Sequence, residues 1–268
     1  MKKFEGILFL SDIDGTLTND DGQLPENNIR AIRYFQENGG LFTVASGRLP
    51  RFIGKFSGDF SPNTYIVGSN GTVIYDPEKE ETVWAKELDP AVMQMISDTT
   101  ARFPCISSLY FSDITGDVSV ERKDFSRMAE KISAALDTPV CRAIVCQDAE
   151  DTPMVRRFLL DTYGDRYNFN CSWPGGVEIH AKGSGKGEVI PILKELLLKD
   201  GKPIHTVIAA GDFENDVTML RTADIGYAAA NATDLTKAAA DRITVSNNEG
   251  VIASILKDIE GRIQTAFS

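Results

Sequence analysis

Short, continuous apolar runs alternate with amphipathic segments in the first third of the chain. Residues 6–11 form one such run and residues 41–45 form another. Between them, residues 25–40 begin with a proline, carry apolar residues at helical spacing and end in two glycines. Runs of this kind are typical of strands covered on both faces, and the segment between them is typical of a helix. The order strand, helix, strand predicts a parallel, doubly wound (Rossmann-like) sheet.

The last third of the chain repeats this rhythm. Residues 184–201 have the pattern of an amphipathic helix, and residues 205–212 form a buried strand that ends in an aspartate. Further segments alternate helix and strand to the end of the sequence, at residues 215–223, 224–231, 233–241, 242–246 and 250–267. The pattern therefore predicts one α/β core domain, built from residues 1–82 and 183–268.

The middle of the chain has a different pattern. Residues 64–76 predict two strands around a turn at Asn70-Gly71. After about Thr82, helices are grouped with adjacent antiparallel strands: helices at residues 88–103, 124–136 and 152–167, strands at 106–113, 117–123 and 141–148, and a hairpin at 169–183. Residues 83–182 are thus predicted to be an inserted α+β cap domain, whose length is typical of a small domain.

Composition narrows the class of protein. The chain has 268 residues, of which 42% are hydrophobic and 25% charged, as in ordinary soluble globular proteins. The net charge of −11 argues against nonspecific binding to nucleic acid or to anionic membranes. A small phosphorylated metabolite stays compatible with this charge, because a metal ion and one or two basic side chains reverse the field locally.

Cysteine and histidine usage bears on metal chemistry and location. The four cysteines form no Cys-x-x-Cys pair and there are only two histidines, so a zinc site is not expected. Scattered thiols suit a reducing compartment, and no segment approaches the ~20 apolar residues of a membrane span. The N-terminal apolar run is short and has the pattern of a first strand rather than a signal peptide. We therefore expect a soluble, cytoplasmic protein. The oligomeric state stays open, and a monomer is compatible with the sequence.

The candidate chemical groups share one position in the predicted fold. They lie at the carboxyl end of a core strand or at the start of the next helix, and they are Asp12, Asp14, Ser46, Lys186, Asp212, Asn215 and Asp216. In a parallel sheet these ends face a common crevice. Carboxylates gathered there repel one another unless a cation lies among them. Hard oxygen ligands without histidine or cysteine suit Mg²⁺.

Each residue type at this edge has a chemical task open to it. A carboxylate can attack phosphorus and divide one displacement into two easier ones. A second carboxyl, two residues further, can protonate the leaving oxygen and then deprotonate the attacking water. A serine hydroxyl and a lysine ammonium can hold phosphoryl oxygens, over which the transition-state charge spreads.

Four ordered motifs carry a resemblance to a known family. They are "DIDGT" at residues 12–16, "VASGR" at 44–48, Lys186 in "GSGKG", and "GDFEND" at 211–216. Together they resemble the motifs of the haloacid dehalogenase superfamily. The insert, with "SNGTVI" and "VEIHAKGSGKG", is similar to that of the Cof-type phosphatases with a type IIB cap. The resemblance covers nearly the whole chain.

The resemblance implies roles for the reacting groups. It makes Asp12 the nucleophile and a Mg²⁺ ligand. It makes Asp14 the general acid/base, with its backbone carbonyl as a further ligand. Ser46 and Lys186 are implied to contact the phosphoryl group, and Lys186 is counted with the catalytic residues.

Further positions are implied to support these groups. Asp212 is the third protein ligand of the metal, and Asp216 is assigned to the metal shell with it. Asn215 supports the metal shell or the phosphate site. Gly47 and Asn70 line the same crevice. One departure from the family pattern, Ala229, touches no reacting group.

Other interpretations of the motifs are weaker. A calcium loop starting at Asp12 fails, because its sixth position is Leu17 instead of glycine. A nucleotide-binding phosphate loop before Lys186 lacks its first glycine and its final serine or threonine. In the cap, Trp173 and Glu178 are candidates for substrate contact, and Trp173 is equally compatible with the cap core. The two histidines, His180 and His205, are expected to be structural or exposed.

The sequence thus predicts a Mg²⁺-dependent hydrolase of small phosphomonoesters, such as a sugar phosphate, acting through an aspartyl-phosphate at Asp12. The cap is expected to close over the crevice, exclude water and contact the leaving group. Two alternatives stay open. One is a phosphomutase of the same superfamily, and the other is a non-catalytic module that accepts a phosphoryl group or binds metal. The physiological substrate is not given by the sequence.

Overall fold

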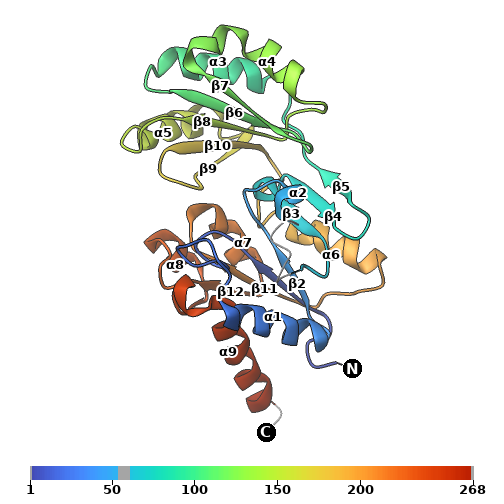
Figure 1. The fold of residues 1–268 in the computed structure, drawn as a ribbon. Helices are drawn as coiled ribbons and strands as arrows, with labels where there is room; N and C mark the ends of the chain where they lie inside the picture. The colour runs from blue at the N-terminus through green and yellow to red at the C-terminus, as the bar shows by residue number, and fades with distance from the viewer. Residues whose placement is uncertain (1, 54–60, 267–268) are drawn as a thin grey trace.

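The computed structural model describes residues 2–53 and 61–266, which form two bodies (Figure 1). One body holds both ends of the chain, and the other holds the middle of the chain. Among the described residues, no helix combines the length and the apolar character that crossing a bilayer requires.

The first body is built on a parallel five-stranded sheet. Its order is β13-β12-β11-β1-β2, with strands β1 (Ile7–Ser11), β2 (Leu41–Val44), β11 (Thr206–Gly211), β12 (Ile225–Ala228) and β13 (Arg242–Ile243). All neighbours in this order pair in parallel. The α/β class predicted from the alternating pattern is therefore confirmed, with the first strand of the chain at an inner position of the sheet.

Helices cover both faces of this sheet. On one face, Phe9 of β1 packs in a cluster with α1 (Glu26–Glu37) and α9 (Val251–Ala266). On the other face, Leu8 and Leu10 pack with α6 (Ile190–Lys199) and α7 (Val217–Thr222). A fifth helix, α8 (Asp234–Ala239), contacts α7. Because successive side chains of a strand point to opposite faces, burial on both faces explains the unbroken apolar runs.

A small antiparallel sheet extends the first body toward the second. Its strands are β3 (Ile66–Gly68), β4 (Val73–Asp76) and β5 (Glu81–Ala85). A parallel bridge from Ala45 to Val67 connects it to the segment after β2, where a short helix, α2 (Pro50–Ile53), follows. The predicted strand, turn and strand around Asn70 is confirmed. In that turn Asn70 itself has a left-handed backbone, with φ of 54°.

The second body is an antiparallel five-stranded sheet with helices on one face. The strand order is β7-β6-β8-β10-β9, with β6 (Ser108–Ser112), β7 (Asp117–Glu121), β8 (Arg142–Cys146), β9 (Tyr167–Asn170) and β10 (Gly176–Ala181). The helices are α3 (Val92–Arg102), α4 (Met128–Ala135) and α5 (Thr152–Tyr163). Figure 1 shows α3 and α4 together on the side of this sheet that faces away from the first body.

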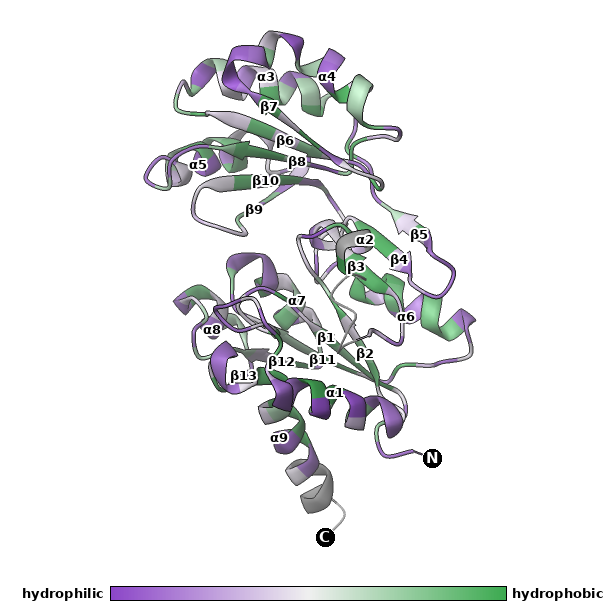
Figure 2. Cartoon of the chain, in the orientation of Figure 1, coloured by the Kyte–Doolittle hydropathy of each residue, from purple (hydrophilic) through white to green (hydrophobic). Residues whose placement is uncertain are grey.

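Side-chain alternation makes the two faces of the second sheet different. Ala143 and Val145 of β8, like Val177 and Ile179 of β10, belong to the apolar cluster under the helices. The residues between them therefore point to the opposite face, and they include Arg142, Ile144, Glu178 and His180. In Figure 2 strand β8 is largely coloured as hydrophobic, whereas β10 alternates between hydrophobic and hydrophilic residues. The helix-free face is thus the polar one.

Some element boundaries differ from the predicted ones. The helix expected from residue 184 begins only at Ile190, and residues 186–189 form a turn before it. Pro191 in the first helical turn explains this start, because a proline there gives up an N–H that has no helical partner. The helix expected at residues 124–136 is a 3-10 segment to Arg127 followed by α4. Strand β5 crosses residue 82, so the proposed bounds of the cap stay a prediction.

Candidate active site

The carboxyl ends of β1, β2 and β11 bring three predicted residues to one edge of the parallel sheet. Asp12 directly follows β1, and its backbone N–H donates to the carbonyl of Ala210 at 2.9 Å. Ser46 follows β2 and is buried, with its N–H bonded to the carbonyl of Val67. Asp212 directly follows β11. The sheet ladder thus fixes the backbone from which each of these side chains projects.

Lys186 is the buried centre of the charged groups. Its Nζ donates to carboxylate oxygens of Asp12 and Asp216, at 2.6 Å each. The side chain has almost no solvent exposure, which acts to lower the pKa of its ammonium group, but the two carboxylates outweigh burial and raise that pKa. Lys186 therefore keeps its positive charge, although it is buried.

Two glycines let the lysine reach this position. Gly71 has φ of +91°, and a Cβ atom on it would lie 2.1 Å from the carbonyl carbon of Gly185. The turn after β3 can therefore cross the segment before α6 only where residue 71 lacks a side chain, and Gly185 has a φ of +143°, which also favours glycine.

Asp216 orients the neighbouring loop as well as Lys186. One of its oxygens accepts from Lys186, and the other accepts from the backbone N–H groups of Asp212 and Phe213, at 2.9 and 3.1 Å. Asp212 in turn accepts a hydrogen bond from the hydroxyl of Thr16 at 2.6 Å. Both oxygens of Asp216 are thus engaged, whereas Asp12 and Asp212 each use one oxygen in these bonds.

The acidic groups fit a hard divalent cation. Asp12, Asp212 and Asp216 each offer an oxygen within 4.8 Å of the others. Burial and the charge of Asp216 raise the pKa of Asp212 to about 7. Burial, with the charges of Asp216 and Asp212, also raises the pKa of Asp12, although Lys186 acts in the opposite direction. A cation among these oxygens would favour their ionised forms, and an all-oxygen donor set suits Mg²⁺.

Asp14 lies apart from this acidic group. Its side chain is 57% exposed and forms a two-point ion pair with Arg48, with N···O distances of 3.0 and 2.6 Å. The backbone N–H of Arg48 also donates to Oγ of Ser46. Arg48 was not among the predicted site residues. In the sequence, Arg48 directly follows the small residues of the second motif, and this position could have indicated a role in the site.

Asn70 joins the two bodies through its side-chain amide. Its Nδ2 donates to Glu178 at 2.6 Å and to Ser172 at 2.8 Å, and its Oδ1 accepts from Asn215 at 3.0 Å. Both N–H groups and the oxygen of the amide thus form hydrogen bonds in this bridge. Glu178 and Ser172 belong to the cap side, and Asn215 belongs to the loop after β11.

Arg142 forms a second connection between the bodies, and the sequence prediction missed it. Its Nη1 donates to the backbone carbonyl of Gly47 at 2.5 Å, and Nε and Nη2 donate to Ser112. Glu178 lies 3.8 Å away. Burial acts to raise the pKa of Glu178, but the hydrogen bond with His180 and the charge of Arg142 outweigh it and lower that pKa to about 2. In the sequence, Arg142 is the one charged residue of an otherwise apolar strand. That pattern alone is too weak to identify it as a site residue.

A cavity of about 360 Å³ lies where these groups meet. From the first body it is lined by Asp12, Asp14, Ser46, Gly47, Arg48, Asp212, Phe213 and Asn215, and from the second by Arg142, Ile144, Ser172, Trp173 and Glu178. Lys186, Asp216 and Asn70 are each hydrogen-bonded to a lining residue. The predicted residues are therefore brought together at one cavity. Of the two histidines, His180 is buried and His205 is exposed.

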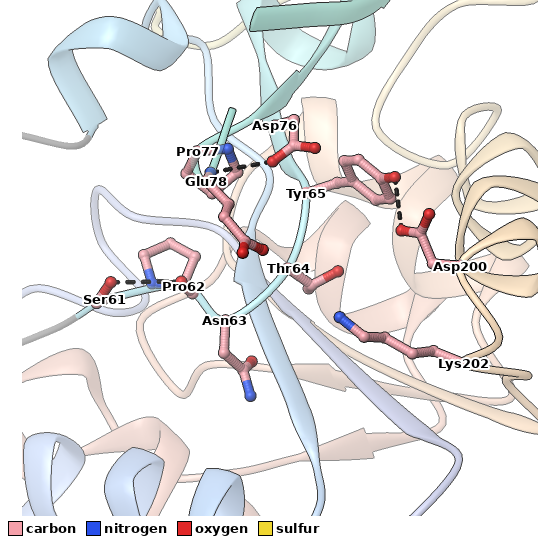
Figure 3. Close-up of a pocket in the computed structure, with 10 residues that line it drawn as sticks. All are labelled: Ser61, Pro62, Asn63, Thr64, Tyr65, Asp76, Pro77, Glu78, Asp200 and Lys202. Carbon is pink, nitrogen blue, oxygen red and sulfur yellow. Dashed lines mark hydrogen bonds between the residues drawn. The ribbon is translucent and has the colours of Figure 1, made fainter. Parts of the chain in front are cut away.

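A second cavity, of about 390 Å³, lies elsewhere on the first body (Figure 3). Its lining includes Tyr65, whose hydroxyl donates to Asp200 at 2.7 Å, and Asp76, which accepts from the backbone N–H of Glu78. None of the four motifs contributes a residue to this lining. Two of its carboxylates, those of Asp76 and Asp200, are bonded to their own neighbours, so the candidate chemistry lies in the first cavity.

The chain is similar to hydrolases and phosphatases over most of its length. The family model described as haloacid dehalogenase-like hydrolase matches residues 9–256. The 5-amino-6-(5-phospho-D-ribitylamino)uracil phosphatase YitU of Bacillus subtilis is 25% identical, over 94% of this chain and 96% of its own. An HMP-PP phosphatase of Klebsiella pneumoniae is 29% identical over 85% of each chain. The solved structure of a subclass IIB sugar phosphatase superposes with a TM-score of 0.74, at 19% identity, over 94% of this chain and 98% of its own.

Proposed function

Because this chain belongs to the haloacid dehalogenase-like hydrolases, as a phosphatase of their Cof type, we propose that it hydrolyses small phosphomonoesters in a Mg²⁺-dependent reaction through a phosphorylated Asp12. One observation carries the proposal: a buried lysine bonded to the carboxylates of Asp12 and Asp216 at 2.6 Å, beside Asp212. A purely structural role would not require three carboxylates and a lysine to be buried together beside a cavity.

In the first step a carboxylate oxygen of Asp12 attacks phosphorus, and the bond from phosphorus to the leaving oxygen breaks. Asp14 gives its proton to that leaving oxygen, so the alcohol departs neutral. The Ser46 hydroxyl and the Lys186 ammonium hold the phosphoryl oxygens, over which charge spreads in the transition state. Before this step Arg48 must release Asp14, because it bonds both carboxylate oxygens.

In the second step water attacks the phosphorus of the acyl phosphate. Asp14 takes a proton from this water, and the bond between phosphorus and Asp12 breaks to release inorganic phosphate. Asp12 returns as a carboxylate bonded to Lys186. Both steps use Asp12 as the nucleophile or leaving group and Asp14 as the acid or base. Because these tasks differ, the two carboxylates need different surroundings.

A divalent cation fits the oxygens at this site. Asp12, Asp212 and the backbone carbonyl of Asp14 would hold it. Asp216 would support the metal shell, since its two oxygens already bond Lys186 and backbone N–H groups. When bound, Mg²⁺ supplies positive charge that offsets the carboxylates and the phosphoryl oxygens.

The substrate is proposed to be a small phosphorylated metabolite. The relatives are named as phosphatases of phosphorylated small molecules, and the cavity of about 360 Å³ lies at the small end of ligand sites. No observation favours a phosphomutase over hydrolysis. A cytoplasmic location, suggested by the four free cysteines, stays a prediction.

The test is phosphate release from phosphomonoesters, with Mg²⁺ and with a chelator. Asp12→Asn should lower turnover by roughly three to six orders of magnitude, as loss of a covalent nucleophile does. Asp21→Asn is the matched control, because that exposed aspartate follows β1 too but does not line the cavity. Near-normal activity of Asp12→Asn contradicts the mechanism. In ¹⁸O water a hydrolase puts label into released phosphate, whereas a mutase transfers the group without it.

A further inference from the structure

The second cavity, of about 390 Å³, lies between the small antiparallel sheet and the end of α6 (Figure 3). Thr64 and Tyr65 reach it from the segment before β3, Glu78 from the turn after β4, and Asp200 and Lys202 from the segment after α6. The hydroxyl of Tyr65 donates to Asp200 at 2.7 Å and so joins two of these sides. Among the described residues, the linings of the two cavities share none.

A buried hydroxyl without a partner lies in the wall of the second cavity. Thr64 is only 9% exposed, and its Oγ1 forms no hydrogen bond with any described residue. A buried polar atom that stays unpaired lowers the stability of the folded state, so such atoms are rare in proteins. A ligand bound in the cavity would give this hydroxyl the partner that the chain itself does not supply.

Charged groups that surround Thr64 are available to a ligand as well. Within the described part of the chain, neither Nζ of Lys202 nor the carboxylate of Glu78 is bonded to another residue. Asp200 uses one carboxylate oxygen for Tyr65 and keeps the other. In Figure 3 the side chains of Lys202 and Glu78 both extend toward the part of the cavity where Thr64 lies. The second cavity thus offers two carboxylates, one ammonium and one hydroxyl.

These groups decide which class of ligand fits. A phosphate ester would meet two carboxylates and only one ammonium, so its charge is wrong for this cavity. A single metal ion does not fit either, because the described acids that gather closely enough to hold one are Asp12, Asp212 and Asp216. The two carboxylates can each accept from a cationic group, whereas Lys202 and Thr64 can donate to a carboxylate. A ligand with two cationic groups and one carboxylate would satisfy all four groups.

We propose that the second cavity binds a free amino acid with a cationic side chain, whose two cationic groups contact Glu78 and Asp200 and whose carboxylate contacts Lys202 and Thr64. The volume of about 390 Å³ lies at the small end of ligand sites, which suits a single amino acid. Because this cavity is separate from the one that holds Asp12, the inference goes beyond the proposed phosphatase activity and does not depend on it.

The first test is isothermal titration calorimetry of the full chain with L-lysine and two analogues. L-Norleucine lacks the side-chain ammonium, and cadaverine lacks the carboxylate. We expect L-lysine to bind with a Kd of about 1 mM or tighter, and each analogue at least about tenfold more weakly, since each loses a charge-assisted hydrogen bond. Asp12→Asn should keep the affinity for L-lysine, because that residue lines the other cavity. No binding of L-lysine up to about 10 mM overturns the inference, whether or not the protein releases phosphate.

Lys202→Met tests the contact with the carboxylate. The variant should bind L-lysine at least about tenfold more weakly. It should bind cadaverine no more weakly than the wild type does, because that ligand has no carboxylate to lose. Lys199→Met is the matched control, since this exposed lysine ends α6 but does not line the cavity. An equal loss of L-lysine affinity in both variants would show that general charge, and not this site, attracts the ligand.

Thr64→Val separates a ligand contact from a structural role. The change removes the hydroxyl and keeps the branched shape of the side chain. We expect the affinity for L-lysine to fall severalfold, while the unfolding midpoint of the ligand-free protein stays the same or rises, because an unpaired buried hydroxyl is lost. A hydroxyl with a purely structural role predicts the reverse, a lower midpoint with unchanged affinity, and that result contradicts the inference.

Discussion

At the scale of single residues, the site depends on charges that are buried but paired. Lys186 is bonded to two carboxylates, and Glu178 is surrounded by His180, Arg142 and the Asn70 amide. Burying an isolated charge costs several kcal/mol, so each of these groups depends on its partners to stay ionised. The same partners also fix the orientation of each charged side chain.

Glu178 gives a prediction about pH. Its pKa is lowered from 4.5 to about 2, so the folded protein binds fewer protons than the unfolded chain between these values. The ionised group therefore contributes stability above pH 4.5 and loses that contribution as the pH falls through about 2. The stability difference between wild type and Glu178→Gln should shrink by about 3 kcal/mol over this window, as urea unfolding would measure. Glu150→Gln, at an exposed cap position, should show no such change.

At the scale of elements, the site depends on where two loops cross. The turn after β3 and the segment before α6 meet at Gly71 and Gly185, and this contact holds the backbone from which Lys186 projects. A strand end alone does not place the lysine. The two loops can meet this closely because residue 71 lacks a side chain.

Gly71→Ala tests this crossing. The new methyl group would meet the backbone of Gly185, so the loop must move and carry Lys186 away from Asp12. We expect a loss of stability of about 2–3 kcal/mol and a fall in kcat of at least about a hundredfold. Gly201→Ala is the matched control, because its φ is also positive (+72°) but nothing lies within 4 Å of its added Cβ. If both variants lose activity equally, the contact is not what positions the lysine.

The sequence predicted elements and strand ends well, because these depend on local patterns. Asp12, Ser46 and Asp212 could be assigned to one edge, since parallel strands end together. The contacts of Arg48 and Arg142 could not be predicted. Arg48 pairs with Asp14 and Arg142 with the carbonyl of Gly47 only because of the path that the backbone takes between distant segments. For the same reason, the sequence could not decide whether Trp173 belongs to the cap core or contacts the substrate.

At the scale of the whole molecule, hydrogen bonds connect the two bodies beside the cavity. Asn70 reaches Glu178 and Ser172, and Arg142 reaches the carbonyl of Gly47. Such bonds can exchange for bonds to water at little net cost, unlike a buried apolar contact. This joint therefore suits a cap that must open to admit substrate and release phosphate.

Asn70→Gly tests this joint. Glycine tolerates the left-handed backbone at this position, so the variant removes the amide without adding strain. We expect a severalfold rise in KM and a larger radius of gyration in solution X-ray scattering, with little change in the unfolding midpoint. Glu80→Gly, at an exposed residue with φ of 56°, makes the same backbone change away from the cavity and should leave KM as it is. An unchanged KM in Asn70→Gly would show that the amide does not hold the cap.

The pairing of β1 with β11 also has a consequence for the order of biosynthesis. Ile7 pairs with Thr206, so the strand that precedes Asp12 is made about 200 residues before this neighbour. All five strands of the cap sheet lie between these two in the chain, so they leave the ribosome before β11 does. Lys186 and Asp212 emerge after the cap strands. The nascent chain can therefore assemble its cap sheet while Asp12 is still apart from Lys186 and Asp212, and the candidate site is complete only after β11 has been made.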